Sequence, residues 1–121
     1  MISYTPAEIQ ELLKGPRFLD LPTERECPAC GNVSVRTYMY EFEGAPGRPS
    51  IISYTWCASC RRGSGATGTR PRGLTFTDPL ESMSRAERLE LSRSGGLFEL
   101  LDRLWDEGKL PQKFGRDAAQ A

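Results

Sequence analysis

Two closely spaced pairs of cysteines constrain this 121-residue chain more than any other feature. The pairs are Cys27 with Cys30 and Cys57 with Cys60, and two residues separate the members of each pair. That spacing lets one tight turn direct two sulfurs at the same ion, and Gly31 suits a turn position with positive φ. The chain contains no histidine, so a zinc ion has to be bound by sulfur or carboxylate. The sequence therefore predicts a single metal site formed by the four thiols.

The donor set indicates what kind of site this is. Four thiolates complete a tetrahedron and leave no position for water or a substrate, which is typical of structural zinc. Zinc is therefore the expected ion, and the ligand set does not exclude iron. A redox dithiol is a further alternative, but such a pair opens a helix after a strand. Here Cys27 follows a polar loop and Cys30 precedes a predicted strand.

A β-hairpin is predicted between the two cysteine pairs. Alternating side chains predict a strand from Val33 to Phe42, and β-branched and aromatic residues predict another from Ser50 to Trp56. The hairpin brings the two cysteine pairs together at its outer end. Tyr38 and Tyr40 share one strand face, which is predicted to pack on a flanking helix, with stacking on nucleic-acid bases as the alternative.

The residues after the second cysteine pair contain a glycine pattern and a possible third strand. Residues 72–77 alternate in a way that predicts a strand, and residues 63–68 match the Gly-x-Gly-x-x-Gly pattern of dinucleotide sites. That pattern acts between a buried strand and a helix start, whereas here a cysteine turn precedes it and Pro71 follows closely. We therefore interpret residues 63–68 as a flexible loop, with anion binding beside the neighbouring arginines as the alternative.

Three helices are predicted outside the hairpin. Thr5 and Glu8 form a capping-box pattern that opens a helix over residues 6–14. Ser84 and Glu87 form a second one, which opens a helix that ends near residue 94. Leucines at spacings of three and four predict a last helix over residues 97–107.

These elements predict an α+β fold in one domain, residues 1–114. A small antiparallel ribbon of two or three strands occupies residues 25–77, flanked by an N-terminal helix and, within residues 78–108, by two C-terminal helices. Residues 115–121 are predicted to be a disordered tail.

The strings Cys-Pro-Ala-Cys-Gly and Trp-Cys-Ala-Ser-Cys, joined by the predicted hairpin, resemble the zinc-ribbon class with two rubredoxin-type knuckles. The resemblance covers about residues 25–77 and implies a metal-stabilised hairpin. Ribbons of this kind occur in transcription, translation, enzyme-accessory and protein-docking proteins. The ribbon followed by a leucine-rich helix is also similar to small bacterial toxin-neutralising proteins, which implies an immunity-type role.

Composition and charge favour a binding role in the cytoplasm over catalysis. The start lacks a secretory signal pattern, and no apolar run approaches the roughly 18 residues that span a membrane. Without histidine, an open metal position or a nucleophile beside a base, we expect no enzyme.

Another protein is the expected partner, and nucleic acid is the alternative. Residues 27–77 carry six basic and two acidic side chains, but zinc with four thiolates adds a charge of −2, and the whole chain is neutral before metal binding. That charge is well short of a strongly basic nucleic-acid surface. The side chains that would contact phosphates or bases are Arg61, Arg62, Arg70, Arg72, Tyr38 and Tyr40.

Overall fold

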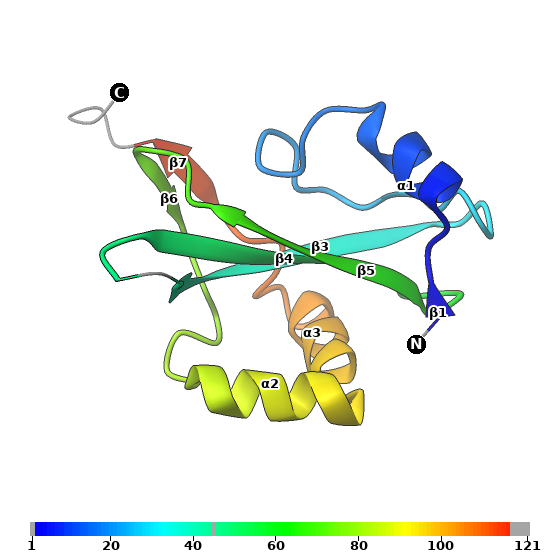
Figure 1. Cartoon of the computed structure of the whole chain (residues 1–121). Coiled ribbons are helices and arrows are strands. Elements are labelled where there is room, and N and C mark those ends of the chain that lie inside the picture. The colour runs from blue at the N-terminus through cyan, green and yellow to red at the C-terminus, as the bar shows by residue number, and fades with distance from the viewer. Residues whose placement is uncertain (1, 45, 117–121) are drawn as a thin grey trace.

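The computed structural model describes residues 2–44 and 46–116, which form an α+β fold as predicted. A mixed five-stranded sheet carries helices on both faces, and a small two-stranded sheet lies at one end (Figure 1). In chain order the elements are β1 (Ile2–Ser3), α1 (Pro6–Leu13), β2 (Arg25–Glu26), β3 (Val33–Glu43), β4 (Pro49–Cys57), β5 (Arg62–Thr69), β6 (Leu74–Phe76), α2 (Arg85–Ser94), α3 (Gly96–Asp106) and β7 (Phe114–Arg116).

The predicted hairpin is confirmed and forms the centre of the large sheet. Strands β3 and β4 pair without a break from Val35 opposite Cys57 to Glu43 opposite Pro49. The strand order is β1-β5-β4-β3-β2, with β1 parallel to β5 and the other neighbours antiparallel. This register places both cysteine pairs at the same end of the sheet.

The third strand of the ribbon is not the one predicted. Residues 62–69 form β5 and pair with β4, whereas the expectation was a flexible loop at 63–68. Gly65 of this strand lies beside the Tyr54 ring, which a Cβ at that position would meet at 3.5 Å, an ordinary contact distance. Residues 74–76, predicted as the third strand, pair with β7 instead. They do so because Leu74 and Phe76 bury apolar surface there with Met39, Ile51 and Phe114.

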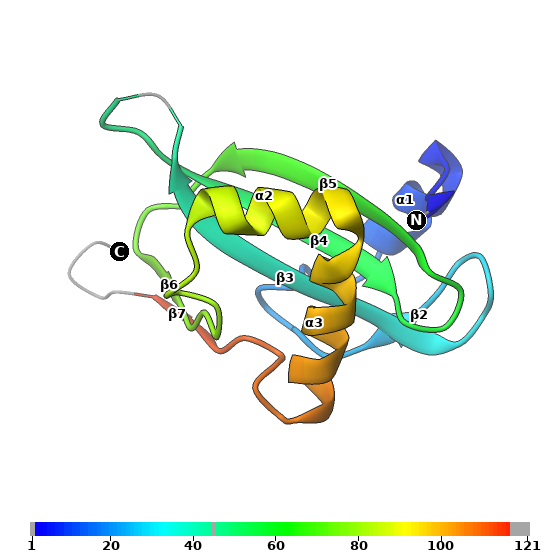
Figure 2. The ribbon, with the colours of Figure 1, turned by 90° about the horizontal axis from the view of Figure 1, so that it is seen from below.

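The two faces of the large sheet are covered very differently. Helices α2 and α3 cover one face, while α1 and the chain after it lie over the other (Figures 1 and 2). The α2/α3 side holds the largest apolar cluster, built from aromatic side chains of the strands and leucines of α3 and its neighbours. Its buried members are Tyr38, Tyr40, Tyr54, Trp56, Leu80, Leu97, Leu101, Leu104 and Leu110.

The helix starts follow the predicted capping boxes. The Thr5 hydroxyl accepts a hydrogen bond from the Glu8 backbone N–H while the Glu8 carboxylate accepts one from the Thr5 N–H. Ser84 and Glu87 make the same reciprocal pair at α2, and Gly95, at φ 81°, ends that helix.

The tail that was expected to be disordered, residues 115–121, begins with two residues that form part of a strand. Gly115 and Arg116 belong to β7, where the expectation was a disordered tail, and residues 117–121 lie outside the described residues. Within the described residues, no helix combines the length and the apolar character that a membrane span requires.

Candidate metal centre

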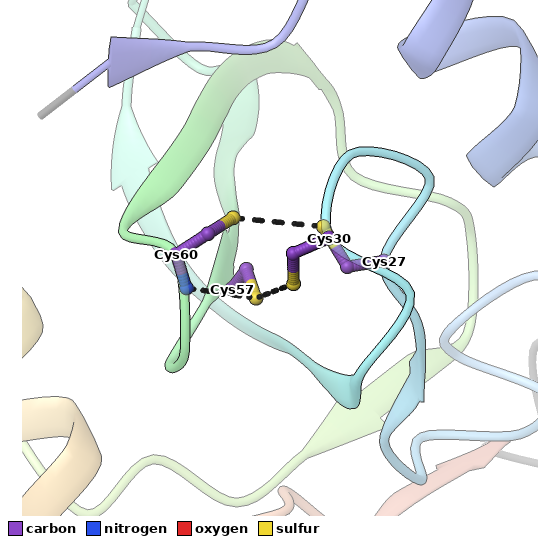
Figure 3. Close-up of side chains that lie close together, drawn as sticks. All are labelled: Cys27, Cys30, Cys57 and Cys60. Atoms are coloured by element: carbon purple, nitrogen blue, oxygen red, sulfur yellow. Dashed lines mark hydrogen bonds between the residues drawn. The ribbon is translucent and has the colours of Figure 1, made fainter.

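The fold brings the four predicted cysteine ligands to one point. Their sulfurs all lie within 4.8 Å of one another, with Cys27 to Cys60 at 3.7 Å and Cys30 to Cys57 at 3.7 Å. All four side chains converge on a common centre (Figure 3). Zinc bound at about 2.3 Å to four sulfurs in a tetrahedron separates those sulfurs by about 3.8 Å. The four cysteines could therefore hold one metal ion with little movement.

Each cysteine pair is carried on a tight turn, which we call the first knuckle (residues 27–31) and the second knuckle (residues 57–61). The Cys27 carbonyl accepts a hydrogen bond from the Gly31 N–H at 2.8 Å, and the Cys57 carbonyl accepts one from the Arg61 N–H at 3.0 Å. The last residue of each turn has positive φ, 79° at Gly31 and 63° at Arg61. Gly31 thus has the backbone conformation predicted for it, and Arg61 adopts the same one with a side chain.

Hydrogen-bond donors around the sulfurs favour their ionised form. The Ala29 N–H donates to the Cys27 sulfur and the Cys60 N–H to the Cys57 sulfur, both at 3.4 Å. The Ser34 hydroxyl lies 3.2 Å from the Cys57 sulfur. Such donors stabilise a thiolate, which is the species that binds a metal ion.

The Tyr4 hydroxyl lies 3.1 Å from the Cys27 sulfur. Burial and the neighbouring thiols raise the pKa of Tyr4, so its hydroxyl keeps the proton and donates to the sulfur. Tyr4 and Ser34 were not identified from the sequence. Tyr4 lies 23 residues before Cys27, and nothing in the local pattern links the two.

The thiols of Cys27, Cys30 and Cys57 differ in their tendency to ionise. Burial opposes ionisation of Cys57, but hydrogen bonds from the Cys60 N–H and the Ser34 hydroxyl lower its pKa to about 6. The pKa of Cys27 is also lowered, because the hydrogen bond from Tyr4 and two backbone N–H groups outweigh burial. The Asn32 N–H lowers the pKa of Cys30, but burial and the three neighbouring thiols outweigh it and raise that pKa to about 11.

The site is buried on one side and open on the other. Cys27 and Cys57 are 1% and 0% exposed, Cys60 is partly buried and Cys30 is exposed. Cys27 and Cys57 also belong to an apolar cluster with Tyr4 and Val35. An ion held here would therefore lie between this apolar cluster on one side and the protein surface near Cys30 on the other.

Asp102 on α3 links the second knuckle to the helical layer. Its carboxylate accepts hydrogen bonds from Arg61 at 2.7 Å and from Arg36 at 2.9 Å. The indole N–H of Trp56, next to Cys57, donates to the same carboxylate at 2.8 Å. Periodicity placed Asp102 on the outer side of the last helix and gave no sign of this role.

The four arginines singled out in the sequence do not form one surface. Arg61 and Arg62 lie at the start of β5, and Arg70 and Arg72 follow its end, so the length of an eight-residue strand, about 25 Å, separates the two pairs. Arg61 is paired with Asp102, and Arg70 is paired with Glu41 at 2.8 Å. Arg70 also donates to the Leu74 carbonyl. Arg62 hydrogen-bonds to Cys60, which raises the pKa of its guanidinium.

The two tyrosines considered for base stacking are buried under the helices. Tyr38 and Tyr40 are 0% and 1% exposed, and the Tyr38 hydroxyl donates to Asp78 at 2.7 Å. The Arg88 guanidinium lies over the Tyr40 ring, 4.3 Å from its centroid. The prediction that these rings pack under the helices is thus confirmed. Neither ring is accessible to a nucleic-acid base.

Comparisons with protein-family models, with curated proteins and with solved structures gave no match for this chain.

Proposed function

We propose that this protein is a non-catalytic zinc ribbon in which one structural zinc ion, bound by Cys27, Cys30, Cys57 and Cys60, maintains a surface that docks another protein. The convergence of four sulfurs within 4.8 Å carries the proposal. Four thiolates fill the tetrahedral shell of zinc, so the ion has no free position at which to activate water or a substrate. Its contribution is then to folding.

A single metal site is favoured over redox chemistry, with zinc as the expected ion and iron as the alternative. The sulfurs of the two pairs approach each other at 3.7 Å across the knuckles, so each pair faces the other and the four act as one set. A tetrahedral sulfur site also accepts iron, which gives a coloured protein, whereas zinc gives a colourless one.

The docking surface that we propose lies at the cysteine-bearing end of the sheet. Val33 follows the first knuckle and is 65% exposed. Ile2 is 61% exposed, and in the sheet it lies opposite Arg62, which follows the second knuckle. Burial of these exposed apolar side chains against a partner protein would be favourable, which is why we place the docking surface at this end. Neutralisation of a bacterial toxin is one concrete form of this role.

A nucleic-acid partner has less support. Its phosphate contacts would come from arginines that stand at opposite ends of β5, two of which are engaged with carboxylates. Binding of this kind weakens steeply as the salt concentration rises. Salt dependence therefore separates the two interpretations.

A capture experiment with matched variants tests the docking proposal. The zinc-loaded full chain, Val33→Asp and Leu13→Asp are immobilised and exposed to extract of the cells that make the protein, in one portion with nuclease treatment and in one without. Leu13 is 70% exposed on α1 and serves as the control for adding a charge at an apolar surface position. The proposal predicts one protein held by the native chain and by Leu13→Asp and lost by Val33→Asp. Equal capture by all three chains, or capture that nuclease abolishes, would contradict it.

A further inference from the structure

A cavity of about 360 Å³ lies between α1 and the sheet face opposite α2 and α3. Its walls include Ile9, Leu12 and Leu13, the apolar side of the helix. Its floor is formed by β4 and β5, which contribute Ser53, Thr55, Ser64 and Ala66. The volume falls in the range of about 300–1,000 Å³ that small-molecule sites occupy, and the walls are mainly apolar, as in such sites.

The cavity exists because the sheet presents small side chains where the helix presents large ones. No residue of α1 is fully buried, although Ile9 and Leu12 face the sheet side. On the opposite face the same strands carry Tyr54 and Trp56, which fill the space under α3. Core side chains normally pack without gaps of this size. The apolar side of α1 is therefore left without a matching surface.

One cation at the cavity has no anionic partner among the residues that the structure describes. The Arg25 guanidinium stacks on the Phe18 ring at 3.8 Å and donates to the Leu21 carbonyl at 3.4 Å. Its Nε has no hydrogen-bond partner, and within the described residues no carboxylate pairs with it. The lining includes no aspartate or glutamate, and its other cation, Arg17, is already paired with Asp20 at 2.9 Å. The cavity is thus apolar with excess positive charge.

We propose that this cavity binds an amphipathic carboxylate, a molecule with an unbranched apolar chain and one ionised carboxyl group. The chain would lie between α1 and the floor of β4 and β5, and the carboxylate would pair with Arg25. A cavity of about 150 Å³ holds benzene, so 360 Å³ accommodates on the order of a dozen non-hydrogen atoms, the size of decanoate. This role goes beyond protein docking and does not depend on it.

The cavity and the metal centre share wall residues, so their ligands should influence each other. Ile9, Leu12 and Phe18 pack on the apolar cluster that contains Cys27 and Cys57. A ligand that orders these side chains would stabilise the metal-loaded fold, and by linkage the metal would strengthen binding of the ligand. Decanoate is therefore expected to raise the chelator concentration that removes half of the zinc from the protein.

Titration calorimetry of the zinc-loaded full chain with sodium decanoate tests the proposal. We expect saturable binding of one decanoate per chain and weaker binding of decanol, which has the same chain without the charge. Ala66→Leu fills the floor and should abolish binding. Thr67→Leu, the next residue of β5, points to the other face and should leave binding within about twofold.

The Arg25→Gln variant separates the contribution of the Arg25 charge to binding from the contribution of the apolar walls. Loss of a charge-assisted hydrogen bond should weaken decanoate about 10- to 100-fold and leave decanol within about threefold. Zinc content measured on each variant shows that it has folded. No saturable binding at millimolar decanoate, equal affinity for decanol, or equal effects of Ala66→Leu and Thr67→Leu would overturn the proposal. So would loss of partner capture by Ala66→Leu in a chain that does not bind decanoate, because the cavity would then receive a protein side chain.

Discussion

Arg61 carries backbone strain that its counterpart in the first knuckle avoids. Among the described residues it is the non-glycine residue with positive φ, and Gly31 holds the equivalent position. A side chain in this left-handed conformation costs about 1 kcal/mol or more. The ion pair with Asp102 offsets part of that cost, since the arginine reaches α3 from this position.

At Arg61, substitution by glycine should give a more stable protein than substitution by alanine, which is the reverse of the usual order. Both Arg61→Gly and Arg61→Ala lose the ion pair, but only alanine keeps the strain. The glycine variant should therefore be more stable than the alanine variant by about 1 kcal/mol. Urea unfolding at a fixed free zinc concentration measures the difference. An alanine variant as stable as the glycine variant would show that Arg61 is not strained.

Asp102→Asn should destabilise the fold by about 2–3 kcal/mol, because it removes the charge that faces Arg36 and Arg61 while it retains an acceptor for Trp56. Asp106→Asn on the same helix is the control. Asp106 is 75% exposed and lies 3.9 Å from Arg36, so its loss should cost less than about 0.5 kcal/mol. Denaturant unfolding of both variants measures the loss in the free energy of unfolding. Similar losses for the two variants would mean that the hydrogen bonds of Asp102 make no particular contribution to stability.

At the scale of elements, β5 is where sequence reasoning failed most clearly. Three glycines and small residues carry no alternation of apolar and polar character, so the sequence predicts a loop over residues 63–68. What makes it a strand is the backbone edge of β4, to which it pairs from Trp56 opposite Gly63 to Ser50 opposite Thr69. That edge becomes available only once the hairpin has formed.

Gly68→Thr should stabilise the protein by about 0.5–1 kcal/mol if β5 is a strand in solution. A Cβ at Gly68 meets nothing within 4 Å, and the residue does not have positive φ, so threonine gains the strand preference without a clash. Gly47→Thr is the matched control in the turn between β3 and β4. Its φ of 73° should make that substitution destabilising by about 1 kcal/mol. Thermal unfolding that shows no gain for Gly68→Thr would favour the loop.

Elements with local signals were predicted well. Both capping boxes open helices, because they satisfy backbone donors within four residues and need no distant partner. The alternation in β3 correctly separated Val35 and Met39 from Tyr38 and Tyr40, since side chains of successive strand residues point to opposite faces. Local rules suffice where the stabilising contact is itself local.

At the scale of the whole molecule, two apolar clusters lie on opposite faces of one sheet. The aromatic cluster under α2 and α3 contains none of the four cysteines, whereas the smaller cluster near α1 contains Cys27 and Cys57. A metal ion held by the four cysteines would therefore support one face directly. Asp102 connects the aromatic cluster to the second knuckle, because it accepts hydrogen bonds from Trp56 and from Arg61.

Removal of one ligand should unfold the molecule unevenly. Cys57→Ser should abolish metal binding and expose backbone amides of β1, α1 and both knuckles to hydrogen exchange, because zinc contributes on the order of 10 kcal/mol to such sites. The centre of β3, around Tyr38 and Tyr40, should stay protected at least 10-fold better than the knuckles, since α3 covers it. Exchange followed by mass spectrometry measures both regions. Uniform loss of protection would mean that the two clusters form one cooperative unit.

Much of the metal centre could be predicted from the sequence, and its surroundings could not. The four ligands follow from spacing alone, because each knuckle is a five-residue unit with its own turn geometry. Tyr4 reaches the site from the residue after β1, and Ser34 and Asp102 reach it from β3 and α3. Their distances depend on how the whole sheet folds. Likewise the cavity under α1 depends on what β4 and β5 present to it.

The metal content of freshly purified, reduced full-length chain tests the central claim most directly. Elemental analysis is combined with a count of the thiols that react with an alkylating reagent before and after addition of a chelator. The account predicts one zinc per chain and four thiols that become reactive only after the chelator has removed the ion. A folded chain that contains neither zinc nor iron and whose four thiols react at once would contradict it.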